Sequence, residues 1–306
     1  MAATERQSSM FVTQSDPERK SWSSQQAYRY CEDIARRHYE NFPVGSLVLP
    51  RSKRPHLHAV YAFARAADDF ADEPGRTPAE RIELLNQWDQ QLTDAYADKA
   101  THPVFIALRE TVSALEIPVD PLRRLLTAFK MDVTKIRYET FEEVLHYCRH
   151  SANPVGELVL LTFGIRDAAL VRLSDSICTA LQLTNFWQDV WVDAARNRIY
   201  IPQEDLSRFG CTVKELRSGK DSQNFRSLLQ FQVHRTRQLF VEGAGLVALL
   251  DGRLKFEVKL IWLGGWRVLE KIEAANCDVL QHRPTISLLD KGLLIVRGLT
   301  LKKPFE

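Results

Sequence analysis

The chain has 306 residues, of which 45% are hydrophobic and 26% are charged. This is the composition of an ordinary globular protein, and it excludes disordered, collagen-like and low-complexity classes. Lysine and arginine number 41 and aspartate and glutamate 39, for a formal net charge of +2. A general nucleic-acid binder carries a larger basic excess to neutralise phosphates, so we expect no nucleic-acid partner.

Residues 1–21 are rich in Ser, Gln and charged residues and lack the apolar stretch of a secretory signal. We expect them to form a flexible amino-terminal arm. The five cysteines are scattered without a C-x-x-C pair, which is typical of reduced thiols in a cytoplasmic protein. Crossing a bilayer takes about 18 consecutive apolar residues, which do not occur, so any contact with the inner membrane should be peripheral.

From residue 22 to 306, apolar residues recur at helical spacing and the turn signals of β-hairpins are missing. Proline and glycine interrupt the pattern at many points, but no linker or internal repeat divides it. We therefore predict one all-α domain over residues 22–306.

The first informative helix is predicted over residues 57–73 (LHAVYAFARAADDFADE). Tyr61, Arg65, Asp68 and Asp72 are spaced 4, 3 and 4 residues apart. At 100° per residue they fall within an arc of roughly 80°. One face of this helix is therefore polar and acidic.

The second informative helix is predicted over residues 177–193 (ICTALQLTNFWQDVWVD). Gln182, Asn185, Asp189 and Asp193 form an equally narrow stripe, and most of the remaining circumference is apolar. Two acids one turn apart usually mark a solvated face. A helix buried on most sides instead places such acids at an internal cavity, where a cation compensates their charge.

Carboxylate and amide oxygens without Cys or His favour a hard cation such as Mg²⁺, completed by water and substrate phosphate. Arg65 and Arg198 would supply cationic contacts to the same phosphate group. The two stripes thus suit the ionisation of a diphosphate ester. No G-x-G-x-x-G motif opens a βα unit, so we expect no NAD(P)H.

Four aromatic residues near the stripes are candidates to line a cavity that excludes water and stabilises a carbocation. They are Phe63, Phe70, Phe186 and Trp187. Taken singly, each is more often an ordinary core residue.

The carboxy-terminal stretch 288–303 (LLDKGLLIVRGLTLKK) mixes Leu, Ile and Val with lysine and arginine. Such a segment could lie at an anionic membrane surface. The favoured alternative is a last core helix whose apolar residues close the bundle.

Several segments resemble the squalene/phytoene synthase family. YAFARAADDFADE and QLTNFWQDVWVDAARNRIYIP are similar to its two aspartate-rich signatures, and further matches follow in the family's order: LVLPRSKRP, MDVTKIRY, YCRHSANPVGELVL and IEAANCDVLQHR. The resemblance covers nearly the whole chain after residue 25. It implies head-to-head prenyl synthase chemistry on a single-domain isoprenoid (prenyl) synthase helical bundle with a central active-site cavity.

The resemblance also implies individual roles. It assigns to Mg²⁺ binding Asp68, Asp72, Asn185, Asp189 and Asp193. The residues that it implies in contacts with the diphosphate or the reacting carbons are Tyr61, Arg65, Tyr147, Gln182 and Arg283. Val155 and Gly156 match a small-residue break that shapes the cavity.

Three departures from the family pattern fall at expected substrate contacts. Asn41 stands where many members carry Ser or Thr, and Trp266 replaces a usual Tyr. Phe186, Trp187 and Gln188 replace a common I-L-R, which removes one cationic contact.

ENFPVGSLVLP and NFWQDV resemble the bacterial hydroxysqualene synthases of hopanoid pathways. This implies a substrate, presqualene diphosphate, that an upstream presqualene diphosphate synthase supplies. Its ionisation, rearrangement and capture by water would give hydroxysqualene without a reductant.

Two alternatives stay open. The chain could condense two farnesyl diphosphates to presqualene diphosphate, which is the same class of chemistry. It could also be a non-catalytic helical assembly factor on the same fold, although such a protein would have little reason to keep both acidic stripes complete.

Overall fold

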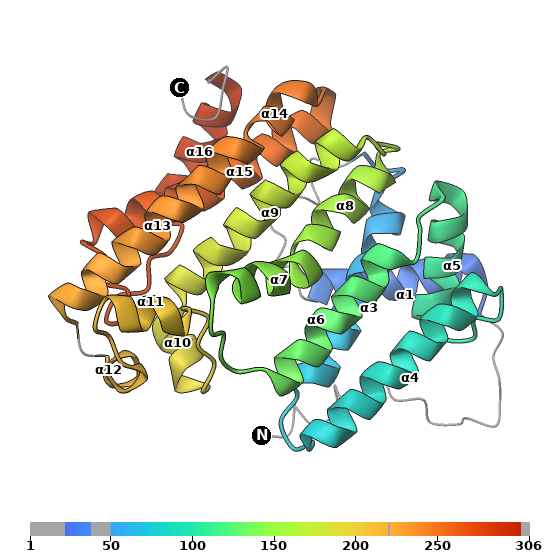
Figure 1. Ribbon diagram of the computed structural model, residues 1–306. Coiled ribbons are helices and arrows are strands. Elements are labelled where there is room, and N and C mark those ends of the chain that lie inside the picture. Colours follow the sequence, from blue (N-terminus) through green and yellow to red (C-terminus); the bar gives the residue numbers. More distant parts are fainter. Residues whose placement is uncertain (1–21, 38–49, 220, 301–306) are drawn as a thin grey trace. The chain divides into compact units, whose positions relative to one another are not determined.

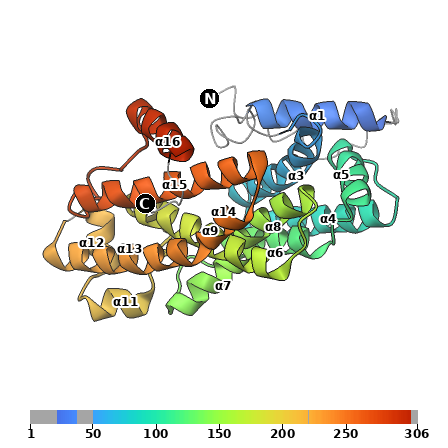
Figure 2. The same cartoon turned by 90° about the horizontal axis from the view of Figure 1, so that it is seen from above.

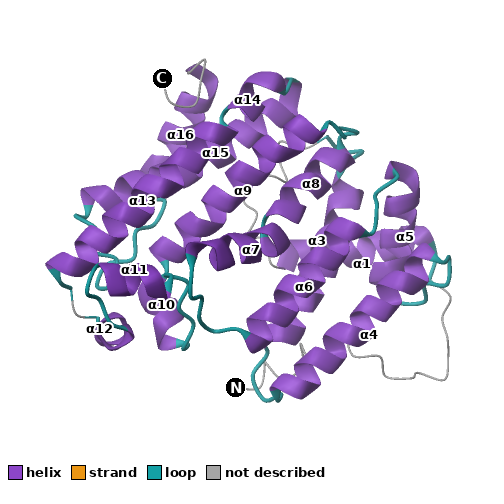
Figure 3. Cartoon of the chain, in the orientation of Figure 1, coloured by secondary structure: helices purple, strands orange, loops and turns teal. Residues whose placement is uncertain are grey.

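The computed structural model describes residues 22–37, 50–219 and 221–300. Within these ranges the regular elements are helices and no strand occurs (Figure 3), which confirms the all-α prediction. The described chain forms two compact units. Unit 1 contains the residues up to 134 together with 161–164, and unit 2 contains 135–160 and 165–300. One domain over residues 22–306 stays a prediction, and the proposed arm lies outside the described residues.

Unit 1 is built from five helices (Figure 1): α1 (Ser24–Arg37), α3 (Arg54–Asp72), α4 (Pro78–Tyr96), α5 (Pro103–Leu115) and α6 (Asp120–Thr134). α4 begins with a capping box, in which Thr77 and Glu80 satisfy each other's backbone N–H groups and Pro78 occupies the first turn. α3 buries an alanine-rich face against α1, α4, α5 and α6. Small side chains allow these helices to approach closely, which leaves the opposite face of α3 for polar residues.

Two of the aromatic candidates belong to the core of unit 1. Phe63 and Phe70 are almost completely buried. Their rings lie 6.3 and 5.3 Å from that of Trp88, whose indole N–H donates to the Phe63 carbonyl at 3.2 Å. The core alternative is therefore correct for both, and they stabilise α3 from behind its polar face.

Unit 2 is built around α9. Its helices are α7 (Phe141–Ser151), α8 (Asn153–Thr162), α9 (Ala168–Gln188), α10 (Val190–Ala195), α11 (Gln203–Arg208), α12 (Val213–Ser218), α13 (Gln223–Gly243), α14 (Gly245–Leu249), α15 (Gly252–Ala274) and α16 (Leu288–Thr300). α9 contacts α7, α13, α14 and α15, which is the burial predicted from its apolar circumference. Trp187 is fully buried and donates to Thr236 Oγ1 at 2.8 Å. Trp187 therefore fixes α9 on α13 as a core residue.

The carboxy-terminal helix α16 packs on α15, as both ribbon views show (Figure 1 and Figure 2). Its buried positions are Asp290, Leu294 and Gly298, whereas most of its apolar side chains are exposed. The favoured expectation that these residues close the core is therefore wrong. None of the described helices is long and apolar enough to cross a bilayer.

Candidate active site

α3 carries the first acidic stripe in unit 1. Arg65 donates to Asp68 Oδ2 at 3.2 Å and to Asp69 Oδ1 at 2.5 Å. Burial raises the pKa of Tyr61, and the nearby Arg65 guanidinium partly offsets this. Asp72 is exposed one turn beyond Asp68. The stripe is thus brought together as predicted, with Asp69 as an additional member that the spacing argument omitted.

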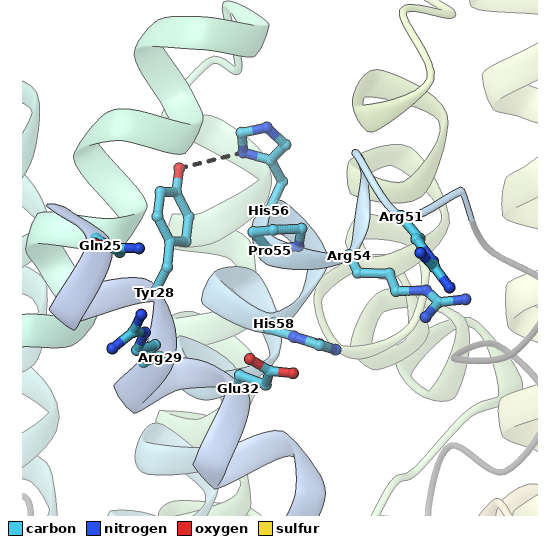
Figure 4. Close-up of a pocket in the computed structure, with 9 residues that line it drawn as sticks. All are labelled: Gln25, Tyr28, Arg29, Glu32, Arg51, Arg54, Pro55, His56 and His58. Carbon is cyan, nitrogen blue, oxygen red and sulfur yellow. Dashed lines mark hydrogen bonds between the residues drawn. The ribbon is translucent and has the colours of Figure 1, made fainter.

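A pocket opens at the amino-terminal end of the same stripe (Figure 4). It is lined by four residues of α1, by Arg51 in the turn before α3, and by four residues at the start of α3; three of the nine are arginines, two are histidines and one is a glutamate. Arg54 and His58 continue the stripe backward from Tyr61 at spacings of 4 and 3. The stripe therefore runs from a cationic end to an acidic end, and the residues predicted for the site lie on the acidic part.

The second stripe, in unit 2, is carried by two helices instead of the single predicted helix over 177–193. α9 ends at Gln188 and α10 begins at Val190, because Asp189 leaves the helical region with φ −106° and ψ 15°. Short polar side chains such as Asp compete with the helical backbone, so this residue tolerates the break. Asp189 N–H still donates to Asn185 O at 3.0 Å, and Asp193 N–H to Asp189 O at 2.9 Å. The predicted spacing of the stripe survives the break.

The electrostatics of this stripe depend on a distant arginine. Arg283 forms a two-pronged ion pair with Asp189, and its Nη2 lies 3.1 Å from Oδ2. This bond raises the pKa of the Arg283 guanidinium. Burial, and then the neighbouring Asp189 carboxylate, raise the pKa of Asp193 to about 7, against the opposing charges of Arg198 and Arg196. Two close carboxylates among arginines form a site where a cation and an anionic group would be held together.

Gln188 holds the segment that carries Arg283. Its side-chain amide donates to the carbonyl of Pro284. Gln188, which stands where the family pattern has an arginine, therefore holds the backbone of the Arg283 segment beside Asp189. This contact joins residues 96 apart in sequence, so motif spacing could not reveal it.

An aromatic group lies beside the second stripe. The Phe186 ring stacks on Tyr200 at 3.7 Å and 6°. Tyr147 lies 6.0 Å from Phe186 and 5.8 Å from both Tyr138 and Tyr200. Phe186 and Tyr147 were predicted, whereas Tyr138 and Tyr200 were not singled out. The sequence could have indicated both tyrosines, because they lie in segments that match the family, MDVTKIRY and RNRIYIP.

Backbone hydrogen bonds place the two unpredicted tyrosines side by side. Ile199 N–H donates to Ile136 O at 3.1 Å, and Gln203 N–H donates to Tyr138 O at 2.9 Å. The chain segments before α7 and after α10 thus run together, and the Tyr138 and Tyr200 rings stack at 5.7 Å. This pairing of segments fixes the position of the Tyr200 ring on which Phe186 stacks.

Gly156 and Val155 lie at the start of α8. A Cβ added at Gly156 would lie 2.6 Å from Cys178 Sγ of α9 and still closer to Ser174 Oγ. Gly156 therefore permits α8 to approach α9. Val155 is partly exposed.

The other predicted residues are more dispersed. Gln182 is half-buried on α9 and Asn185 is exposed one turn later. Trp266 lies on α15, where its ring stacks on Trp262 at 4.8 Å and the Arg237 guanidinium lies 4.2 Å above it. Its role in substrate binding stays a prediction. Asn41 lies outside the described residues.

The donor set suits a hard cation that keeps part of its shell for other ligands. Among the described residues, no three His, Cys, Asp or Glu side chains converge into a metal cage. Asp189 and Asp193 are close enough to repel each other, and Asn185 adds an amide oxygen one turn away. Mg²⁺ is commonly held by one or two carboxylates plus water and phosphate oxygens, so these residues fit it.

Comparisons with known proteins place the chain in a family. The model of the family described as "Squalene/phytoene synthase" matches residues 35–290. A hydroxysqualene synthase of Rhodopseudomonas palustris is 36% identical, covering 78% of this chain and 80% of its own. A phytoene synthase of Arthrospira platensis is 28% identical, covering 88% and 91%.

A solved structure supports the same assignment. The squalene synthase HpnC of Alicyclobacillus acidocaldarius superimposes with a TM-score of 0.79 at 40% sequence identity, covering 83% of this chain and 95% of that one. The chain therefore belongs to the squalene/phytoene synthase family, whose members are isoprenoid synthase enzymes that act on isoprenoid diphosphates.

Proposed function

We propose that the chain is a hydroxysqualene synthase. It would ionise presqualene diphosphate, let the cyclopropylcarbinyl cation rearrange and capture it with water. The support from the comparisons is that hydroxysqualene synthases match at 35–36% identity, against 28% for the phytoene synthase above. The observation that carries the proposal is the Asp189–Asp193 pair with Arg283, set beside the stack of Phe186 on Tyr200.

The acidic residues would hold the metal and the arginines the diphosphate. We assign as Mg²⁺ ligands Asn185, Asp189 and Asp193 in unit 2 and, from the family resemblance, Asp68 and Asp72 in unit 1. Mg²⁺, when bound, neutralises charge on the departing diphosphate. Arg198 and Arg283 would contact the phosphate oxygens, and a guanidinium offers two parallel donors for this.

The aromatic group would stabilise the cation and exclude stray water. Ring faces attract cations, and stacked rings such as Phe186 and Tyr200 form a rigid apolar surface. Tyr147 adds a hydroxyl at the same group. His150 could in principle position the attacking water, but it is half-buried and its Nδ1 lies 2.9 Å from the carbonyl oxygen of His146, which supports a structural role for it.

The reaction balances without a reductant. The carbon–oxygen bond to the diphosphate breaks, and the diphosphate leaves with the electron pair. After rearrangement, a water oxygen bonds to the cation and releases a proton to solvent or to the diphosphate. The products are hydroxysqualene and diphosphate, so no NAD(P)H is required.

The test is product identification with each substrate supplied alone. The purified enzyme, with Mg²⁺ and no reductant, should convert presqualene diphosphate to hydroxysqualene, whereas Asp189→Asn should not. Formation of presqualene diphosphate from farnesyl diphosphate, with no turnover of added presqualene diphosphate, would instead establish the condensation alternative.

A further inference from the structure

The surface of α16 has an inverted distribution of polar and apolar residues. Six apolar side chains point away from α15, at exposures of 38–87%: Leu288, Leu289, Leu293, Ile295, Val296 and Leu299. At 100° per residue they occupy an arc of roughly 160°. We call this set the outer face of α16. A surface helix normally turns its apolar stripe toward the core, so an apolar stripe that faces outward indicates a surface that binds a partner.

The inward side of α16 is held on α15 by polar contacts. Asp290 is buried and pairs with Arg267 at 2.9 Å and Lys271 at 2.6 Å. Lys259 donates from its ammonium to the Gly298 carbonyl at 2.8 Å. These bonds set the rotation of α16 about its own axis, because a turn that buried the outer face would expose Asp290 and break both ion pairs.

Close packing at Gly298 adds to this constraint. A Cβ at this position would lie 2.7 Å from Leu260 and 3.2 Å from Phe256 of α15. The helices therefore meet along this line, and the outer face is fixed as an external surface.

Two basic residues border the outer face. Lys291 is exposed beyond one edge of the apolar arc; Arg297 lies beyond the other, where it is half-buried and pairs with Glu270 of α15 at 3.5 Å. Asp290, the only acidic residue of α16, faces inward. Lys302 and Lys303 follow in the sequence. An apolar strip that is bordered by the exposed Lys291 and followed in the sequence by two lysines complements a surface with anionic headgroups above hydrocarbon.

The size of the face argues against a second copy as the cover. Stable interfaces between proteins use about 20 to 30 residues from each side. The outer face supplies six side chains from one helix. A lipid surface has no such minimum, because each apolar side chain partitions separately.

We propose that the outer face of α16 docks the protein on anionic lipid surfaces, with the helix lying in the plane of the interface. This inference stands on α16 and does not depend on which isoprenoid diphosphate is used. If the proposed function holds, the docked state would bring the enzyme to substrates and products with long hydrocarbon chains.

The test is vesicle flotation of the full chain without substrate. The protein should float with phosphatidylcholine vesicles that contain phosphatidylglycerol, and less with phosphatidylcholine alone. Leu288→Ser/Leu289→Ser and Val296→Ser/Leu299→Ser should each lower the partition coefficient by about tenfold or more. Lys291→Gln should lower it by about fivefold, an effect that high salt removes.

Matched controls separate the outer face from general surface hydrophobicity. Val241→Ser/Leu249→Ser removes exposed apolar side chains from α13 and α14 of the same unit, and should leave flotation unchanged. All variants should retain wild-type melting temperature and activity on detergent-dispersed substrate. Equal loss of flotation in the control pair would overturn the proposal.

Two further outcomes would also overturn it. One is a wild-type dimer that the outer-face variants convert to monomers, without vesicle binding by either form. The other is flotation that appears only after residues 1–21 are deleted, since the arm would then be the cover. Because binding is measured without turnover, neither result bears on the proposed reaction.

Discussion

The two acidic stripes differ in how their charge is compensated. On α3 the compensation is local, because Arg65 lies in the stripe and bonds to Asp68 and Asp69 within one turn. On α9 and α10 it is distant, because Asp189 is paired by Arg283, 94 residues away. Burial and the Asp189 carboxylate raise the pKa of Asp193 to about 7, in spite of the nearby arginines. The comparison indicates that part of the charge of the α3 stripe is offset within its own helix, whereas in the second stripe Asp189 depends on a distant arginine and Asp193 resists ionisation, which a bound cation would favour.

The largest expected effect comes from removing a ligand of the second stripe. Asp189→Asn should lower kcat by about 10³-fold, because an anionic ligand and the partner of Arg283 are lost together. Asp69→Asn is the matched control on α3, since it weakens a bond to Arg65 without removing a proposed ligand, and should cost at most about tenfold. Steady-state kinetics with circular dichroism measure both. Equal losses would contradict the distinction between the stripes.

The next largest effect is expected on the free energy of unfolding of the Mg²⁺-free protein when Asp193 is replaced. Native Asp193 keeps its proton to about pH 7, whereas the unfolded chain loses it near the ordinary value of 3.8. The native state binds more protons between these values, so the free energy of unfolding falls as pH rises through this window. Asp193→Asn removes that fall and should stabilise the Mg²⁺-free protein at pH 8 by about 1–2 kcal/mol.

Denaturant titrations at pH 5 and pH 8 check this expectation for Asp193. The gain should be absent or much smaller at pH 5, where the wild-type carboxyl is already neutral. A gain of the same size at both values would mean that the burial of charge is not its cause.

A smaller effect is expected at Gln188, which anchors the segment of Arg283. Gln188→Ala should raise KM for the diphosphate substrate by about tenfold, since losing this part-buried hydrogen bond costs about 1 kcal/mol and misplaces the arginine. Gln188→Arg should also raise KM, because the longer, charged guanidinium cannot occupy the position of the Gln188 amide beside Asp189 and Arg283 without displacing them. Gln238→Ala on the exposed face of α13 is the control. An unchanged KM and product ratio in both Gln188 variants would make this residue a bystander.

The smallest effect on stability is expected at Asp68. Its side chain is 45% exposed and its bond to Arg65 is a pair within one helix, so Asp68→Asn should change the unfolding free energy by at most about 0.5 kcal/mol. The activity of Asp68→Asn should still fall, because Asp68 is a proposed Mg²⁺ ligand. Thermal melts alongside kinetics separate the two. A destabilisation of 2 kcal/mol or more would show that the α3 pair is structural.

The features that could be predicted from the sequence are those that follow from local periodicity. The all-α class, the buried α9 and the membership of both stripes depend on residues within one or two turns of each other. The period of 3.6 residues sets their common faces whatever the surrounding fold. The family motifs indicated the same aspartates, because those motifs are also short, local segments of sequence.

Tertiary structure decided how those local pieces are completed. The pairing of Arg283 with Asp189, the stack of Phe186 on Tyr200 and the anchor from Gln188 to Pro284 join distant segments, and no local period encodes them. The same holds for α16. Its sequence favoured a core helix by its many Leu, Ile and Val residues, but the buried ion pairs of Asp290 with Arg267 and Lys271 turn those residues outward. Burying a carboxylate requires its partners, and the positions of those partners on α15 fixed the direction in which α16 faces.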